Sequence, residues 1–71
     1  SDRGGFMKVL RVFDRDLNRY LTAAEVLQEV NRDRSADWTP YNSMDLLLNP
    51  EDLADWIDPQ FYDVLLEDFL S

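Results

Sequence analysis

The reactive side chains of this 71-residue chain are mostly carboxylates, and oxygen-bearing residues are most closely spaced between positions 14 and 25. Cys and His are absent, which excludes disulfides, thiolate metal sites, the usual zinc ligand and the usual general base. Positions one, three, five, nine and twelve of the segment are Asp14, Asp16, Asn18, Thr22 and Glu25. Neighbouring carboxylates can perform acid–base chemistry, but no nucleophile accompanies these, so we do not expect an enzyme.

This twelve-residue segment resembles the calcium loop of the EF-hand family. In that loop, oxygens at alternate positions surround the ion, and the last Glu binds it through both oxygens. The resemblance implies one Ca²⁺ ion of weak to moderate affinity, with the ligands Asp14, Asp16, Asn18, the carbonyl of Tyr20, Thr22 and Glu25. One position departs from the pattern, because Arg19 stands where the loop normally turns through a Gly with positive φ.

Apolar residues on both sides of the loop have helical spacing. Four of them stand at i, i+3, i+4 and i+7 before the loop, which predicts a helix that leads into it. They are Phe6, Val9, Leu10 and Phe13. After the loop begins, Thr22 and Glu25 have the spacing of a capping box, which predicts a helix over about 23–32.

Two further helices are predicted in the second half of the chain. Thr39-Pro40 and Asp58-Pro59 each have a capping residue followed by Pro at the first helical position. The first of these helices runs to about residue 48, where Asn49-Pro50 ends it. Their apolar stripes are Tyr41, Met44, Leu47 and Leu48, and then Tyr62, Leu65, Leu66 and Phe69.

The EF-hand resemblance implies an arrangement for these helices, because such units occur in pairs. It implies one all-α domain over 1–71, with hand one at about 5–33 and a degenerate hand two at about 39–70. The loops are expected to pair through short strands, Tyr20-Leu21-Thr22 against Trp56-Ile57-Asp58. Phe61 replaces the ligating Glu in hand two, so that hand is expected to be structural. The expected core is Phe13, Leu21, Val26, Ile57, Leu66 and Phe69.

Charge divides the chain into two unlike parts. Residues 1–34 hold all seven basic side chains and six acidic ones, whereas residues 35–71 hold nine acidic side chains and no basic one. An acidic half of this kind repels nucleic acid and favours a basic partner. The expected partner is a protein segment that forms a basic amphipathic helix. The apolar residues expected to bind it are Phe6, Leu10, Met44, Leu47, Leu48 and Leu65.

Two functions fit this pattern. The first is a calcium-binding regulatory module that binds a partner segment, and the alternative is a calcium-independent interaction domain on an EF-hand-like scaffold. A third interpretation is that Asp63–Leu70 resembles the acidic–hydrophobic helices of transcriptional activation segments. No apolar run approaches the roughly 18 residues of a membrane helix and no signal peptide is visible. We expect a fragment of a larger, cytoplasmic protein.

Overall fold

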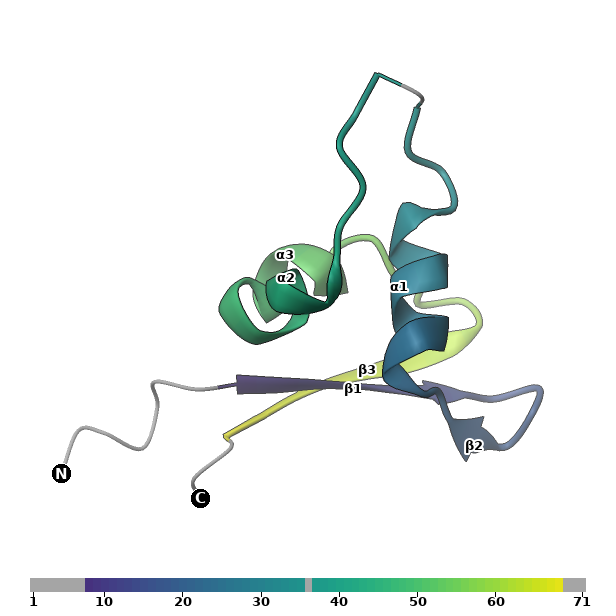
Figure 1. Cartoon of the computed structure of the whole chain (residues 1–71). Coiled ribbons are helices and arrows are strands. Elements are labelled where there is room, and N and C mark those ends of the chain that lie inside the picture. Colours follow the sequence, from purple (N-terminus) through teal and green to yellow (C-terminus); the bar gives the residue numbers. More distant parts are fainter. Residues whose placement is uncertain (1–7, 36, 69–71) are drawn as a thin grey trace, which may run out of the picture.

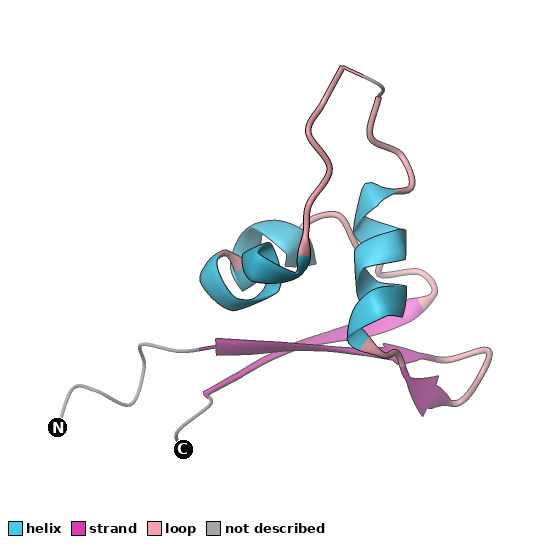
Figure 2. Ribbon diagram, in the orientation of Figure 1, coloured by secondary structure: helices cyan, strands magenta, loops and turns pink. Residues whose placement is uncertain are grey.

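The computed structural model describes residues 8–35 and 37–68 and shows a small α/β fold. Three antiparallel strands form one sheet in the order β2-β1-β3, and three short helices lie on one side of it (Figures 1 and 2). The predicted all-α EF-hand pair is therefore wrong. The segment before the loop 14–25 is a strand, whereas an EF-hand requires a helix on each side of its loop.

The centre of the sheet is the pair of strands β1 (Lys8–Asp14) and β3 (Tyr62–Asp68). Their antiparallel register is unbroken, from Lys8 opposite Asp68 to Asp14 opposite Tyr62. Both segments are rich in β-branched, aromatic and Leu side chains, which fit a pleated surface. Ion pairs cross between the strands, and the closest joins Lys8 Nζ to Asp68 Oδ1 at 2.8 Å.

The alternation of side chains explains why helical spacing misled the sequence prediction. In β1, Val12 is 1% exposed and Leu10 packs against the core, so even-numbered residues face the helices. Phe13 belongs to the opposite face and is not part of the buried cluster, contrary to its predicted core position. In β3, Tyr62 and Val64 pack against the core. This period of two replaces the predicted helical stripe, and it contradicts the acidic–hydrophobic helix over residues 63–68; Phe69 and Leu70 lie outside the described residues.

A tight hairpin joins β1 to β2 (Arg19–Tyr20). The Asn18 amide donates to the Asp14 carbonyl at 2.7 Å, which closes the turn. Asn18 has φ 59°, and Asn tolerates this left-handed region better than most residues. The left-handed residue is thus Asn18, whereas the EF-hand pattern requires it at Arg19. Arg19 itself has strand geometry.

Helix α1 (Ala23–Asn31) confirms the helix predicted over about 23–32. Thr22 is its N-cap, and the predicted capping box with Glu25 is formed in both directions. Val26 and Val30 lie on one face of the helix and are 3% and 0% exposed. The local signals for this helix were sufficient because a cap and an apolar stripe agree.

The remaining helices differ from their predictions. Helix α2 (Ser43–Leu48) begins later than Pro40, because Asn42 is its N-cap and its side chain accepts from the Met44 and Asp45 amides. Helix α3 (Pro50–Ala54) was not predicted and begins at the Pro that was expected only to end the preceding helix. No helix begins after Asp58-Pro59, where the chain turns into β3 instead.

The core lies between the sheet and the helices. Its buried side chains are Val12, Val26, Val30, Leu53 and Ile57. Val26 and Ile57 were predicted core residues, and Leu21 packs against the cluster, whereas Leu66 is 39% exposed. Phe69 lies outside the described residues. The predicted pairing of residues 20–22 with residues 56–58 is not formed. Tyr20 pairs with Phe13 of β1 instead, and residues 56–58 follow α3 as a turn.

Candidate functional site

The predicted calcium ligands do not converge in this fold. Asp14 folds back on its own turn, and its Oδ1 accepts hydrogen bonds from the Asp16 amide at 2.9 Å and the Leu17 amide at 3.1 Å. Asp16 and Asn18 are exposed in the turn. Thr22 is occupied as the N-cap of α1, where its hydroxyl accepts from the Glu25 amide at 3.2 Å.

Glu25, the expected bidentate ligand, is held by other groups. Arg19 donates to both of its oxygens, each at 2.9 Å, and the Thr22 amide donates to Oε1 at 2.9 Å. These hydrogen bonds, that from Arg19 first, lower the pKa of the Glu25 carboxyl from 4.5 to about 2. The same pair raises the pKa of the Arg19 guanidinium. A cation would have to displace Arg19 before it could bind this carboxylate.

The arrangement therefore does not fit the ligand set of an EF-hand loop. Across residues 8–35 and 37–68, no group of three or more His, Cys, Asp or Glu side chains is placed to hold a metal ion. An ion bound through both oxygens of Glu25 would compete with the two hydrogen bonds from Arg19 and would be repelled by its guanidinium charge. Calcium binding stays a prediction, and calorimetric titration is the measurement that decides it.

The structure does bring together most of the apolar residues predicted to bind a partner. Met44, Leu47 and Leu48 are 56%, 60% and 68% exposed on α2. Their spacing of three and four residues places them on neighbouring parts of one helix surface. We call these three residues the α2 patch. Large apolar side chains gathered in this way are typical of an interaction surface.

A cavity of about 230 Å³ adjoins the α2 patch. Leu47 belongs to both, and Leu46 and Leu10 line the cavity from α2 and β1. Leu10, another residue predicted to contact a partner, thus lies beside the patch while packing against the core. Of the other two, Leu65 lies on the opposite face of the sheet, and Phe6 lies outside the described residues.

Carboxylates are frequent on the helices at and after the α2 patch, while Lys8 of β1 lines the adjoining cavity together with Leu47. Asp45 lies within α2, and Glu51, Asp52 and Asp55 lie in or directly after α3, where all three are exposed. No basic residue occurs after Arg34 in the sequence, so none follows along α2, α3 or the loop into β3. The surface therefore combines apolar side chains with a negative rim.

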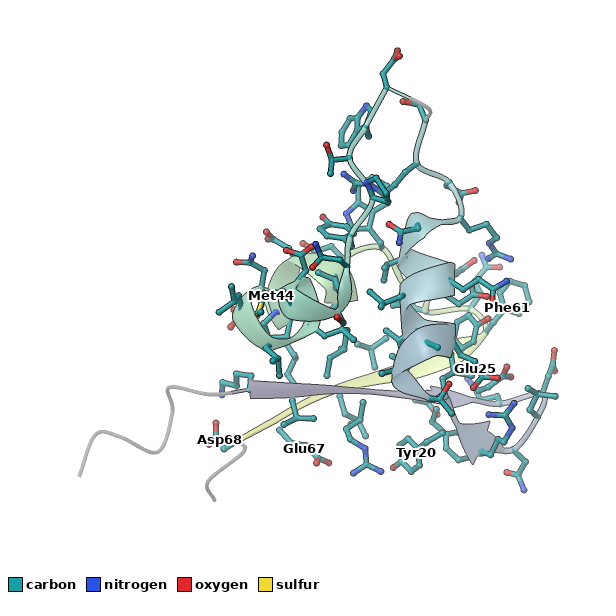
Figure 3. All side chains as sticks on the ribbon, in the orientation of Figure 1. Tyr20, Glu25, Met44, Phe61, Glu67 and Asp68 are labelled. Atoms are coloured by element: carbon teal, nitrogen blue, oxygen red, sulfur yellow. The ribbon has the colours of Figure 1, made fainter. Side chains whose placement is uncertain are left out.

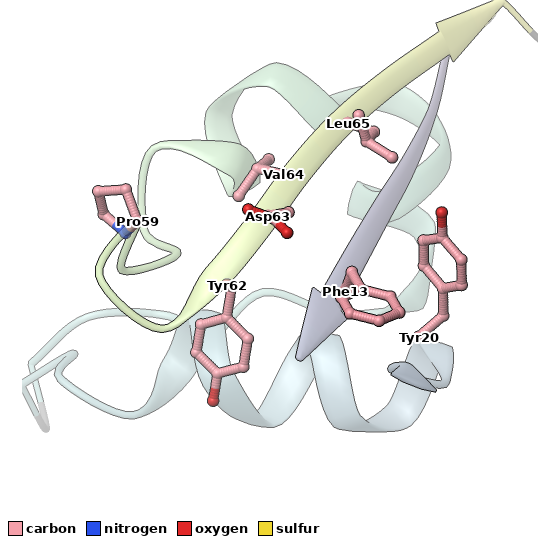
Figure 4. A pocket seen from close by; sticks show the side chains of 7 residues that line it. All are labelled: Phe13, Tyr20, Pro59, Tyr62, Asp63, Val64 and Leu65. Atoms are coloured by element: carbon pink, nitrogen blue, oxygen red, sulfur yellow. The ribbon is translucent and has the colours of Figure 1, made fainter. Parts of the chain in front are cut away.

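A second surface, the sheet face opposite the helices, was not predicted. Figure 3 shows Tyr20 and Glu67 extending from the sheet on the side away from the helices. Phe13 and Tyr20 form an edge-to-face pair with ring centroids 5.1 Å apart, and the Arg11 guanidinium lies 4.1 Å from the Tyr20 ring centroid. A cavity of about 630 Å³ lies beside them (Figure 4). Residues 9–13 are Val, Leu, Arg, Val and Phe, which do not alternate between apolar and polar, so no period-two signal in the sequence could have revealed this face.

An aromatic cluster fixes the segment between α1 and α2. The Arg34 guanidinium lies over the rings of Trp38, Tyr41 and Trp56, with centroid distances of 4.8, 4.2 and 5.3 Å. Its Nη2 donates to the Thr39 carbonyl at 2.9 Å, while Nε and Nη1 are buried without a hydrogen-bond partner. The ring faces compensate for these missing partners, since they attract a cation. This cluster holds the segment against the body of the fold.

Comparisons with protein-family models, with curated protein sequences and with solved structures find no match for the chain. Among the helices of the described residues, none has both the length and the apolar character needed to cross a membrane. The function of the chain must therefore be inferred from the geometry and charge of its two surfaces.

Proposed function

We propose that the chain is a calcium-independent protein interaction module that binds a basic amphipathic helix at the α2 patch. The observation that supports this most directly is the exposure of Met44, Leu47 and Leu48, at 56–68%, on a single short helix. Burying an apolar side chain of this size contributes about 1.5–3 kcal/mol, and most of this free energy is not gained while the three side chains remain exposed. A partner that covers the patch recovers part of that free energy.

The rim of the α2 patch supports a basic partner. Asp45, Glu51, Asp52 and Asp55 all lie on α2, α3 or the residue that follows α3. Complementary charge raises the association rate and selects against acidic partners. An amphipathic helix with apolar residues on one face and Lys or Arg beside them matches both properties of this surface.

The expected affinity is modest. The three side chains are already about 40% covered, so a partner would gain about 1–2 kcal/mol from each. A total of about 3–6 kcal/mol corresponds to dissociation constants from several millimolar to tens of micromolar. This is the range of a transient contact, and salt should weaken it because the rim charges are exposed.

Peptide titration followed by NMR tests the proposal. The probe is a synthetic amphipathic helix of Leu and Lys, and the matched probe carries Glu in place of Lys. We expect the Lys peptide alone to shift amide resonances of residues 43–55, with or without a calcium chelator.

Leu48→Ser should weaken binding about tenfold, whereas Leu17→Ser, which changes a Leu 56% exposed in the β1–β2 turn, should not. Equal binding of both peptides, or equal loss in both variants, would contradict the proposal.

A further inference from the structure

The outer edge of β3 has the properties of a strand-docking site. In the sheet order β2-β1-β3, this strand lies at the edge, and within residues 8–35 and 37–68 no strand pairs with its outer side. Natural edges are often protected by charged side chains (Lys above all), by Pro or by a bulge, and the charged residues of β3 are all acidic, so they repel acidic strands and attract basic ones. Here residues 62–68 contain neither Lys nor Pro, and the register with β1 is continuous over seven pairs. The edge is therefore long and regular enough to template another strand.

The hydrogen bonds of β1 show which backbone groups of β3 point outward. The Leu21 amide donates to Val12 at 2.8 Å, and the Arg15 amide donates to Phe61 at 3.2 Å. Backbone groups alternate between the two sides of an antiparallel strand, so odd-numbered residues of β3 face β1. The amides and carbonyls of Val64 and Leu66 consequently face away from the sheet. Arg15 closes one end of this edge, because its Nη2 donates to the Tyr62 carbonyl at 3.1 Å.

On the side that faces β1, the acidic side chains of β3 already pair with the basic side chains of its neighbour. Lys8, Arg11 and Arg15 of β1 and its turn form ion pairs with Asp68, Glu67 and Asp63, at 2.8, 3.5 and 3.5 Å. The Glu67 and Asp63 side chains are still 51% and 57% exposed. A strand added at the outer edge meets the same carboxylates from the other side.

The cavity of about 630 Å³ lies next to this edge on the face away from the helices. Phe13, Tyr20 and Leu65 supply apolar walls, and Asp63 supplies a carboxylate (Figure 4). Lys and Arg combine an apolar stem with a charged head, so they suit walls of this kind beside an acid. A basic residue placed opposite Asp63 or Leu65 would reach the cavity.

We propose that the outer edge of β3 binds a basic extended segment of another protein by antiparallel strand addition. Lys or Arg at alternate positions of that segment lies with Asp63 and Glu67, and apolar residues between them lie beside Val64 and Leu66. A second copy of this chain is the poorer occupant. Each copy carries a net charge of −8, so two copies repel one another, and pairing two β3 strands about Leu65 also sets Asp63 opposite Glu67 of the other copy. The site is separate from the α2 patch and goes beyond the proposed function.

Binding of a short peptide of alternating Lys and Val tests the backbone part of the proposal. We expect slower amide hydrogen exchange at Val64 and Leu66, whose amides face outward at the middle of β3. In an antiparallel pair, residues directly opposite share a face, so the Val residues of the peptide form the hydrogen-bonded pairs. A peptide N-methylated at every Val should lose binding, and the matched peptide N-methylated at every Lys should keep it. Equal binding of the two methylated peptides would overturn strand addition.

Charge variants test the choice of partner. Glu67→Lys should weaken binding of the Lys–Val peptide about tenfold, because one attraction becomes a repulsion. Asp33→Lys makes the same charge change in the turn after α1, where Asp33 is exposed and belongs to neither proposed surface, and it should leave affinity within about twofold. Circular dichroism tests whether both variants are folded. If Glu67→Lys does not fold, Glu67→Gln takes its place, and we expect it to weaken peptide binding as well. Equal affinities of the two variants, or protection of Val64 and Leu66 by dimerisation without peptide, would overturn the proposal.

Discussion

Leu53→Ala tests the position of α3 against the sheet. Leu53 is 0% exposed and belongs to the buried cluster with Val12 and Ile57. Replacing a fully buried Leu by Ala costs about 2–5 kcal/mol, because apolar contacts are lost and a cavity remains. The core of a domain this small supplies about 3–5 kcal/mol in all. We therefore expect the variant to be largely unfolded at room temperature.

Urea denaturation followed by circular dichroism and Trp fluorescence measures this loss. The matched control is Leu17→Ala, because Leu17 lies in the β1–β2 turn and is 56% exposed. We expect the control to change the free energy of unfolding by less than about 0.5 kcal/mol. In the predicted EF-hand pair, Leu53 was not among the expected core residues. A loss of less than about 1 kcal/mol in Leu53→Ala would therefore refute the packing of α3 against the sheet.

Three further predictions concern the polar contacts. The Glu25 carboxyl should titrate at about 2, so its stabilising contact is complete above pH 4.5 and lost as the pH falls through 2; an NMR midpoint near 4.5 would contradict the pair with Arg19. Arg19→Ala should raise that midpoint, because the Glu25 carboxylate loses the hydrogen bonds and the positive charge of the guanidinium; an unchanged midpoint would speak against this coupling. Arg34→Gln should shift the emission of Trp38 and Trp56 to longer wavelength, since the cluster opens, whereas an unchanged spectrum would show that Arg34 does not hold it.

The sequence was informative where structure depends on near neighbours. Helix α1 follows from the capping box of Thr22 and Glu25 and from the stripe that includes Val26 and Val30. All of these residues lie within nine positions of one another, so local rules decide the outcome. The residues of the α2 patch were also predicted as a partner-binding surface, and their exposure is consistent with that prediction.

The sheet could not be predicted in the same way. Val9, Leu10 and Phe13 satisfy a helical period, but Leu10 and Val12 satisfy a strand period equally well. The choice between them depends on β3, whose contact between Lys8 and Asp68 spans 60 residues of chain. The same uncertainty affected Glu25, which has the right position for a calcium ligand but equally the right position to pair with Arg19. Without knowledge of the hairpin, there is no reason in the sequence to prefer the ion pair.

Both proposed surfaces depend on the antiparallel pairing of β1 with β3, and NMR measures this pairing directly. The residue pairs that do not exchange hydrogen bonds bring their α-protons closest, so we predict strong cross-strand contacts for Leu10 with Leu66 and for Val12 with Val64. Strand-type chemical shifts over 62–68 should accompany them. Successive amide–amide contacts and helical shifts over 62–68, without the cross-strand contacts, would contradict the pairing and both surfaces with it.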